Sequence, residues 1–289
     1  MKYKFIRFPE GKSKAVTLSY DDSCRADIRL SETITRYGLK ATFNIPSHRI
    51  AEKEGGWDLT KEEIRKHFLD KGHEIAIHTA HHLANGLQNT ADGIKEVLDC
   101  RAKLEKDFGI IVRGMAYPDS GIRRLRNGMD YSDVKRYLTD LNIAYARTLG
   151  GDNNGFYLPN DWHAWMPTAH HNNSNIFEYI DDFLNINCNK GYQSNLDARL
   201  FYLWGHSFEF DNHNNWDRLD EICEKLSGKD NIWYATNGEI YDYVTAYNSL
   251  IFSADNSIVY NPSAKTVWFI YGNTPYTIKS GETIKLQNV

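Results

Sequence analysis

Two adjacent carboxylates and a pair of histidines are the residues of this chain best suited to chemistry. Asp21 and Asp22 come shortly after one apolar run, and His78 and His82 come after another. Histidines four residues apart on a helical turn point their imidazoles the same way, as metal ligands require. A carboxylate from Asp22 would complete a His-His-Asp set that leaves positions open for water and substrate, the arrangement typical of zinc hydrolases.

Adjacent aspartates cannot both present the same face to one metal ion, so we expect them to divide the work. One would bind the metal, and the other would act as a base on water. His206 follows the most apolar run of the chain and is a candidate general acid for a departing amine or alcohol. The structural alternatives are a solvated turn for the aspartates, a surface loop or helix cap for the histidine pair, and a packing role for His206.

Short apolar segments alternate with helical patterns over about the first 240 residues. This alternation favours a mostly parallel sheet, closed or nearly closed into a β/α barrel. Thr60 with Glu63 forms a capping box for one helix, and Ser132 is expected to cap another. The predicted strands cover residues 15–18, 40–45, 74–77, 114–116, 143–146, 200–204 and 232–235, and the predicted helices 26–37, 60–72, 91–108, 132–141, 176–184, 216–226 and 239–247.

The candidate residues all follow predicted strands. Asp21 and Asp22 follow the first strand, His78 the third and His206 a late one, and Tyr117, Pro118 and Asp119 follow the fourth. The active site of a β/α barrel lies at the carboxyl ends of its strands. The sequence therefore predicts that these residues share one rim.

The pattern changes near residue 248. Four short strands are predicted beyond it, at 257–260, 266–270, 276–278 and 283–286, with turn residues between them. We expect residues 1–247 to form the barrel and residues 248–289 to form a small antiparallel β appendage. The appendage holds no cluster of ligand-type residues, so packing or substrate-edge roles are expected for it.

Composition narrows the class of protein. A net charge of −4 gives no reason to expect a nucleic-acid partner. No run approaches the ~20 apolar residues of a membrane span, and the N-terminus lacks an apolar export signal, so a cytoplasmic location is expected. An exported chain with its signal removed would look the same. The four cysteines are widely spaced and suggest neither a zinc knuckle nor a disulfide framework. The sequence carries no signal for the oligomeric state.

Several segments resemble motifs of the polysaccharide deacetylase family, carbohydrate esterase family 4. Residues 72–82, Gly-His-Glu-Ile-Ala-Ile-His-Thr-Ala-His-His, match its second motif at every specified position. Residues 17–22 resemble the first motif, 115–118 the third and 203–206 the fifth. The resemblance spans about residues 10–240.

The resemblance implies a distorted (β/α)7-type barrel with a divalent metal, usually Zn²⁺, with Co²⁺, Ni²⁺ or Mn²⁺ as alternatives. It implies Asp22, His78 and His82 as ligands, Asp21 as base and His206 as the acid that protonates the leaving group.

It also implies roles around the metal. Thr79 would form a hydrogen bond within the second-motif loop, and a backbone N–H near Asp119 would help to hold the oxyanion. Tyr117 and Pro118 are candidates for supporting the site or lining a substrate groove.

The chain departs from the family pattern in the third motif. Ala116 stands where an Arg usually braces the catalytic Asp, and Asp119-Ser120 replace the usual Tyr-Gly; Ser23 replaces the Gly that usually ends the first motif. Arg147, after the strand 143–146, is a candidate for the bracing role. Arg113 is expected at the other end of its strand.

The fourth motif is unclear in this chain. Asp161 could polarise His206, and Trp165 could wall the groove, with loop packing as the alternative for both. His170 and His171 are expected to be structural or at the surface.

The sequence therefore predicts a metal-dependent deacetylase that acts on an acetylated sugar or glycan. A related hydrolase of non-sugar amides or O-acetyl esters is one alternative, permitted by the altered third motif. A degenerate barrel that binds glycans without turnover is another.

Overall fold

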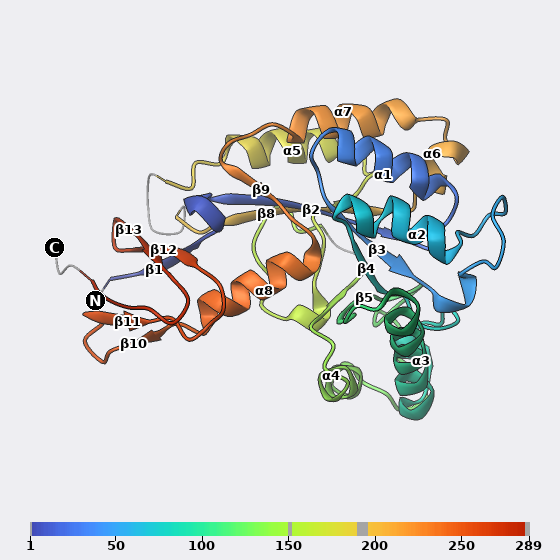
Figure 1. Ribbon diagram of the computed structural model, residues 1–289, viewed down its shortest axis with the longest axis horizontal. Coiled ribbons are helices and arrows are strands. Elements are labelled where there is room, and N and C mark those ends of the chain that lie inside the picture. The colour runs from blue at the N-terminus through green and yellow to red at the C-terminus, as the bar shows by residue number, and fades with distance from the viewer. Residues whose placement is uncertain (1, 150–151, 190–195, 287–289) are drawn as a thin grey trace.

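A curled parallel sheet forms the centre of the computed structural model, which describes residues 2–149, 152–189 and 196–286 (Figure 1). The strand order is β6-β5-β4-β3-β2-β8-β7, with β9 also beside β2. The strands are β2 (Lys14–Asp21), β3 (Ala41–Ile45), β4 (Glu74–Ile77), β5 (Gly114–Ala116), β6 (Tyr145–Arg147), β7 (Ala169–His170), β8 (Arg199–Gly205) and β9 (Ile232–Tyr234).

Helices cover the outside of this sheet. Figure 1 shows α1, α5 and α7 along one face and α3 and α4 beside its curled far end. The helices are α1 (Ala26–Arg36), α2 (Lys61–His67), α3 (Thr90–Phe108), α4 (Tyr131–Asp140), α5 (Ile176–Asn185), α6 (Phe208–Asn212), α7 (Trp216–Leu226) and α8 (Asn237–Asn248).

The segment 165–170 connects the two edges of the sheet. At its start, Trp165 N donates to Ala146 O in the β6 region (3.0 Å). At its end, Thr168 N donates to Tyr202 O (2.8 Å), and β7 pairs with β8 in parallel. These bonds curl the sheet into a distorted (β/α)7-type barrel, which confirms the predicted fold class.

Strand β2 shows how the barrel is packed. All eight of its residues are buried, as expected for a parallel strand covered on both faces. Val16, Leu18 and Tyr20 belong to the large apolar core under the outer helices. Because side chains alternate along a strand, Asp21 points the other way, into the barrel.

Helix α8 closes the amino-terminal end of the barrel. Asn237 N donates to Thr42 Oγ1 (3.0 Å), and Gly238 N donates to the Glu74 carboxylate (2.8 Å). Thr42 and Glu74 stand at the starts of β3 and β4, so this plug lies opposite the strand ends that carry the candidate residues.

The sequence predicts one helix cap correctly and misplaces another. The capping box of Thr60 and Glu63 is present at α2, with both reciprocal hydrogen bonds. The prediction that Ser132 caps α4 is wrong: Asp130 is the cap, and its carboxylate accepts from Ser132 N (2.6 Å) and Asp133 N (3.2 Å). Asp133 completes this box, so the cap lies two residues earlier than expected.

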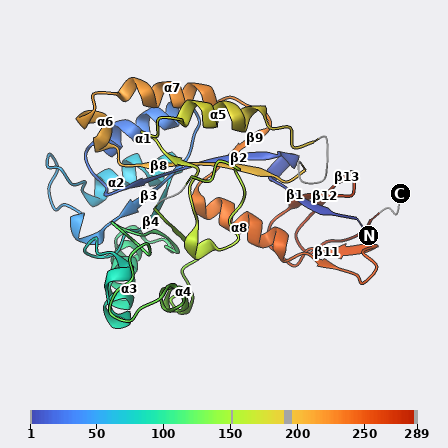
Figure 2. The same cartoon turned by 180° about the vertical axis from the view of Figure 1, so that it is seen from behind.

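Two small antiparallel sheets lie at one end of the molecule (Figure 2). One has the order β1-β12-β13 and the other β10-β11-β14. The first strand of the chain, β1, thus pairs with the C-terminal β12, with Ile6 opposite Phe269. The boundary at residue 248 stays a prediction. These strands are β1 (Lys4–Arg7), β10 (Ile251–Phe252), β11 (Ile258–Tyr260), β12 (Val267–Tyr271), β13 (Thr274–Ile278) and β14 (Thr283–Lys285).

Within the described ranges, no helix combines the length and apolar character needed to cross a bilayer. The cysteines, Cys24, Cys100, Cys188 and Cys223, are all buried and free.

Candidate metal centre and active site

A sharp backbone turn separates the two aspartates at the end of β2. Asp22 and Ser23 have φ angles of +81° and +55°, in a region that residues other than glycine seldom occupy. Asp22 N is held by Asn44 O (3.1 Å), which fixes this turn against β3. Strain of this kind persists where the surroundings impose it, often at functional sites. As a result, the carboxylate of Asp22 points towards His82 and that of Asp21 towards Arg147.

The histidine pair lies on a loop after β4, and the predicted helical turn is wrong. Thr79 and His82 both have a φ of +58°, which breaks any helical path between His78 and His82. Thr79 Oγ1 accepts from Leu83 N (2.9 Å), the hydrogen bond that was expected within this loop. The two imidazoles still converge, with ring centroids 4.8 Å apart.

Glu96 of α3 anchors this loop, a contact that the sequence did not suggest. Its carboxylate accepts from His81 N (2.8 Å) and lies 2.7 Å from His81 Nδ1. This pair turns His81 away from the histidines on either side of it. Of the histidines in this loop, His78 and His82 are then left to face the aspartates.

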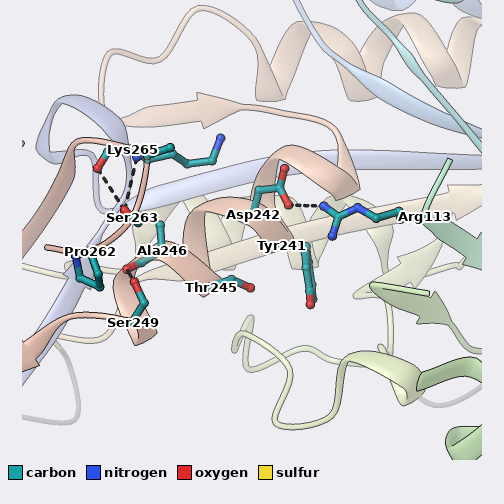
Figure 3. Close-up of a pocket in the computed structure, with 10 residues that line it drawn as sticks. Arg113, Tyr241, Asp242, Thr245, Ala246, Ser249, Pro262, Ser263 and Lys265 are labelled. Atoms are coloured by element: carbon teal, nitrogen blue, oxygen red, sulfur yellow. Dashed lines mark hydrogen bonds and ion pairs between the residues drawn. The ribbon is translucent and has the colours of Figure 1, made fainter. Parts of the chain in front are cut away.

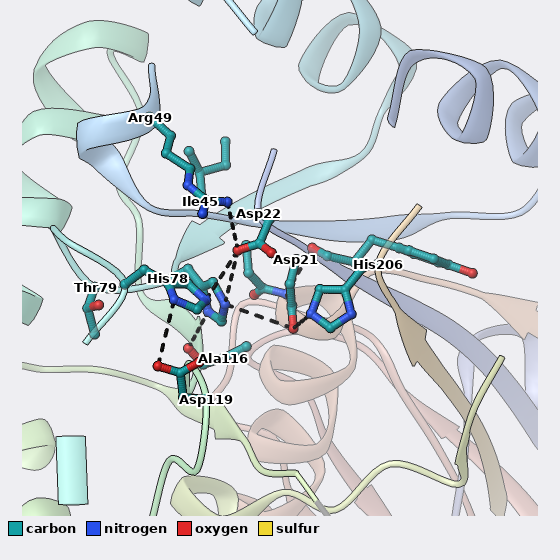
Figure 4. Close-up of polar contacts among 12 residues, drawn as sticks. Asp21, Asp22, Ile45, Arg49, His78, Thr79, Ala116, Asp119 and His206 are labelled. Carbon is teal, nitrogen blue, oxygen red and sulfur yellow. Dashed lines mark hydrogen bonds and ion pairs between the residues drawn. The ribbon is translucent and has the colours of Figure 1, made fainter. Parts of the chain in front are cut away.

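The donor atoms of Asp22, His78 and His82 lie within 4.8 Å of one another (Figure 4). Asp22 Oδ1 is 3.2 Å from His82 Nε2 and 3.9 Å from His78 Nε2. His78 Nδ1 lies 2.9 Å from Ala116 O. Because a carbonyl only accepts, Nδ1 carries the proton and Nε2 keeps its lone pair for a metal. Two imidazoles and a carboxylate with this tautomer fit a divalent cation such as zinc.

Asp21 lies buried beside this group. Asn44 Nδ2 donates to its Oδ1 (2.8 Å), and the guanidinium of Arg147 donates to its Oδ2. Burial alone would raise the pKa of Asp21, but the charge of Arg147 outweighs it and holds the pKa below its usual value. Asp21 is therefore kept ionised.

Arg147 lies in the place that the sequence left without a brace. It ends β6, is buried, and stacks over the Trp204 ring at 4.5 Å from the centroid. Arg113, as expected, lies at the other end of its strand, where it pairs with Asp242 (2.7 Å). Ala116 supplies only its carbonyl, to His78.

His206 faces Asp21 from the side opposite His78 (Figure 4). Its Nε2 lies 3.9 Å from Asp21 Oδ2, and His78 Nε2 lies 4.0 Å from the same oxygen. Burial alone would lower the pKa of His206, but Glu209 and Asp21 more than offset it and raise the pKa. His206 is thus poised to carry a proton.

Glu209, in the first turn of α6, is the carboxylate that the sequence reasoning missed. Its Oε1 lies 3.4 Å from His206 Nδ1, and its Oε2 lies 2.9 Å from His170 Nε2 and 3.0 Å from His171 Nε2. Burial favours the neutral acid, yet these three histidines hold the pKa of Glu209 well below its usual value. The spacing His-x-x-Glu at a helix start was the available signal.

His170 and His171 therefore belong to a cluster of close polar contacts around Glu209. Asn172 N donates to His170 Nδ1 (3.1 Å), which places the proton of the neutral ring on Nε2, facing Glu209. Burial lowers the pKa of His171 to about 4, so this ring stays neutral. A ring nitrogen that carries a proton cannot also bind a metal, so we interpret this cluster as a support for His206.

Asp161 and Trp165 do not take the places suggested for them. Asp161 accepts from Tyr131 Oη and Lys135 Nζ (2.8 Å each) and caps a short turn, while Glu209 provides the carboxylate for His206. Trp165 is 1% exposed and packs against Tyr202 (centroids 4.7 Å apart) inside the barrel. The loop-packing alternative describes both.

Of the three candidate residues after β5, two are buried and one is exposed at the site. Tyr117 is buried, and its hydroxyl donates to His163 O (2.8 Å); burial raises its pKa well above the usual value. Pro118 is also buried, so neither lines an open groove. Asp119 is exposed, has a φ of +48°, and places Oδ2 3.9 Å from His82 Nδ1. Only Asp119 reaches the rim of the site.

A separate cavity of about 450 Å³ lies between α8 and the C-terminal strands (Figure 3). Its lining includes Arg113, Tyr241, Asp242 and Lys265. Arg113 directly precedes β5, so this cavity lies at the opposite end of that strand from the candidate site. It holds no pair of histidines or carboxylates resembling the metal group.

Comparison with known proteins confirms the resemblance seen in the motifs. Residues 9–129 match the family model described as polysaccharide deacetylase. No curated protein matches the chain.

Two solved structures share the fold at low sequence identity, and a third aligns over about half of each chain. A Mycobacterium smegmatis protein described as a polysaccharide deacetylase is 15% identical, with a TM-score of 0.58 over 86% of this chain and 96% of its own. The peptidoglycan deacetylase PdaC of Bacillus subtilis is 16% identical, with a TM-score of 0.51 over 84% and 96%. The Streptococcus pyogenes deacetylase PplD, in complex with acetate, is 19% identical, with a TM-score of 0.40; the match covers 46% of this chain and 55% of PplD.

Proposed function

We propose, from the polysaccharide deacetylase match of residues 9–129, that the chain is a metal-dependent hydrolase that removes acetyl groups from N-acetylated sugars or glycans. The observation that carries the proposal is the convergence of a His-His-Asp donor group with Asp21 and His206 beside it. These are a ligand set, a base and an acid, the parts that amide hydrolysis needs.

Asp22, His78 and His82 would hold the metal. When bound, a divalent ion such as Zn²⁺ supplies Lewis-acid polarisation of the acetyl carbonyl and makes water more acidic. Imidazole and carboxylate donors also suit Co²⁺, Ni²⁺ or Mn²⁺. Ala116 O orients His78 through its Nδ1–H, a hydrogen bond of the kind that raises the basicity of a ligand.

Asp21 would act as the base. Its Oδ2 lies 4.0 Å from His78 Nε2, beside the donor group of Asp22, His78 and His82, and the guanidinium of Arg147 contacts that same oxygen. Arg147 and Asn44 orient its carboxylate and keep it ionised at neutral pH, ready to accept a proton from the attacking water. A base placed in this way contributes about 10²–10⁴-fold to the rate.

His206 would donate the proton that the leaving amine requires. Its raised pKa keeps a fraction of the rings protonated near neutral pH, and its Nε2 faces the side where Asp21 lies. Glu209 orients the ring from the far side through Nδ1. Asp21 takes a proton from water and His206 gives one to nitrogen, so the amide is cleaved to acetate and an amine.

The backbone at Asp119 would help to stabilise the tetrahedral oxyanion. Among the described residues, its N–H donates no hydrogen bond, and its left-handed conformation sets it at the rim beside His82. A fixed donor of this kind is worth about 10²–10³-fold in turnover in hydrolases that use one.

A substrate panel tests the proposal, with acetate release measured for the acetylated sugars and ring opening measured for the cyclic amides. The panel holds N-acetylglucosamine oligomers, an O-acetylated xylan oligomer and small cyclic amides. The proposal expects acetate from the first class, at a rate that falls at least about 100-fold in Asp21→Asn. Turnover of only the esters or the cyclic amides would favour the related hydrolases. Glycan binding without acetate release would favour a binding protein.

Asp242→Asn is the matched control for Asp21→Asn. Asp242 also pairs with an arginine, Arg113, but at the opposite end of the barrel. Its removal should leave acetate release within about twofold of the wild type, because the change lies outside the site.

A further inference from the structure

An exposed tryptophan lies on a loop that is bound to the backbone just after the aspartate pair. Trp57 is 57% exposed, yet Arg25 N donates to its carbonyl (2.7 Å) and Arg25 Nε donates to Gly56 O (3.0 Å). Cys24 and Asp58 form an antiparallel bridge beside it. The position of Trp57 is therefore fixed relative to Asp22, although its ring faces solvent.

Trp57 is one end of a row of rings that runs to His206. Its ring centroid is 5.6 Å from that of Phe208, which is partly exposed at the start of α6. The Phe208 centroid is in turn 5.2 Å from that of His206. Trp57, Phe208 and His206 thus form one aromatic row that leads away from the proposed acid.

The position of His206 at one end of this row indicates which part of a substrate could contact the other two rings. His206 gives its proton to the leaving group, so the sugar that carries the departing nitrogen must lie against His206. Phe208 is the next ring, and Trp57 is one ring further out. The flat faces of a pyranose carry C–H bonds, and aromatic rings offer a large apolar contact area to such a face.

We propose that Phe208 and Trp57 form a stacking subsite for a glycan chain, with Trp57 contacting the sugar next to the acetylated one. The inference rests on the proposed function and adds two residues that would recognise the sugar beyond the acetylated one. Exposing an indole at this place leaves apolar area in water, and the neighbouring sugar would cover it. The row adjoins the acid, so one chain can occupy both.

Binding to an inactive protein tests this subsite without turnover. Titration calorimetry on Asp21→Asn would compare the tetramer of N-acetylglucosamine with the monomer, with and without Trp57→Ala. The tetramer should bind about three- to tenfold more weakly after Trp57→Ala, and the monomer within about twofold of its original affinity. Trp57→Phe keeps a ring and should restore most of the tetramer affinity.

Tyr3→Ala is the matched control. Tyr3 is 58% exposed and also stacks on a second ring, Phe5, but it directly precedes β1, in the small sheet at one end of the molecule (Figure 2). It should leave the affinity for the tetramer unchanged. An equal loss for monomer and tetramer in Trp57→Ala, no loss at all, or no binding of the tetramer by the parent protein would overturn the inference.

The two proposals fail in different ways. Tetramer binding that depends on Trp57, in a wild-type protein that releases no acetate, would support the subsite and contradict the deacetylase. Acetate release in which Trp57→Ala leaves the ratio of kcat/KM for tetramer over monomer unchanged would support the deacetylase and contradict the subsite.

Discussion

The guanidinium of Arg147 contacts the carboxylate of Asp21, although the two residues are 126 positions apart in the chain. Both side chains are almost fully buried. The pair is therefore a feature of the barrel, made when β6 and β2 curl towards each other. It supplies from another strand the positive charge that Ala116 cannot supply from the third motif.

Replacing Arg147 should shift the acidic limb of the activity profile. Arg147 lowers the pKa of Asp21, and the base works only above that pKa. In Arg147→Gln the pKa rises, so activity should be lost at a higher pH, with a displacement of about 1–3 pH units. The pH dependence of kcat/KM measures the shift.

Arg147→Lys separates charge from fold in this experiment. Breaking a buried pair can cost about 3–5 kcal/mol of stability, so circular dichroism must show that each variant is folded. Lys keeps the charge and should leave the limb closer to its original place. A folded Arg147→Gln with an unmoved acidic limb would contradict the bracing role.

Replacing Glu209 should move the alkaline limb. Glu209 helps to raise the pKa of His206, and the acid works only below that pKa. In Glu209→Gln the pKa of His206 falls, so the alkaline limb should move to lower pH by about one pH unit. Glu178→Gln, a change at an exposed position on α5, is the control and should leave the profile in place. A uniform drop in kcat without a shift would mean that Glu209 serves only packing.

A side chain at position 205 should displace the imidazole of His171, which lies in the cluster that supports His206. A Cβ at Gly205 would lie 2.1 Å from Nδ1 of the buried His171. Gly205→Ala should destabilise the protein by about 1–3 kcal/mol, as overpacking of a core does. Thermal unfolding measures the loss, because each kcal/mol lowers the melting temperature by about 2–4 °C in a chain of this size.

Gly56→Ala is the comparison for that change. A Cβ there meets no atom within 4 Å, and Gly56 does not need a positive φ. Its melting temperature should stay within about 2 °C of the wild type. Equal melting temperatures for both variants would show that His171 moves aside at no cost.

Sequence predicts the strand ends well because buried parallel strands are short apolar runs. The runs before Asp21, His78 and His206 gave both the fold class and the common rim. Arg147 was also identified as the candidate brace, because it directly follows such a run. These predictions use local composition and one rule about barrels.

Other parts depend on contacts that no local pattern encodes. The loop of His78 and His82 is set by two left-handed residues and by Glu96, 15 positions beyond His81. Glu209 reaches His170 and His171 only after β7 and β8 pair. Trp165 resembles a groove residue in sequence, but the barrel buries it where the sheet closes.

Metal content and acetate release, measured together on three proteins, test the central claim most directly. The account predicts about one divalent ion per chain in the wild type and in Asp21→Asn, and almost none in His78→Ala. Acetate release from the N-acetylglucosamine tetramer should occur only in the wild type, and should stop with a chelator and return with added metal. A His78→Ala protein that keeps its metal and its turnover, or a chelated wild type at full rate, would contradict the account.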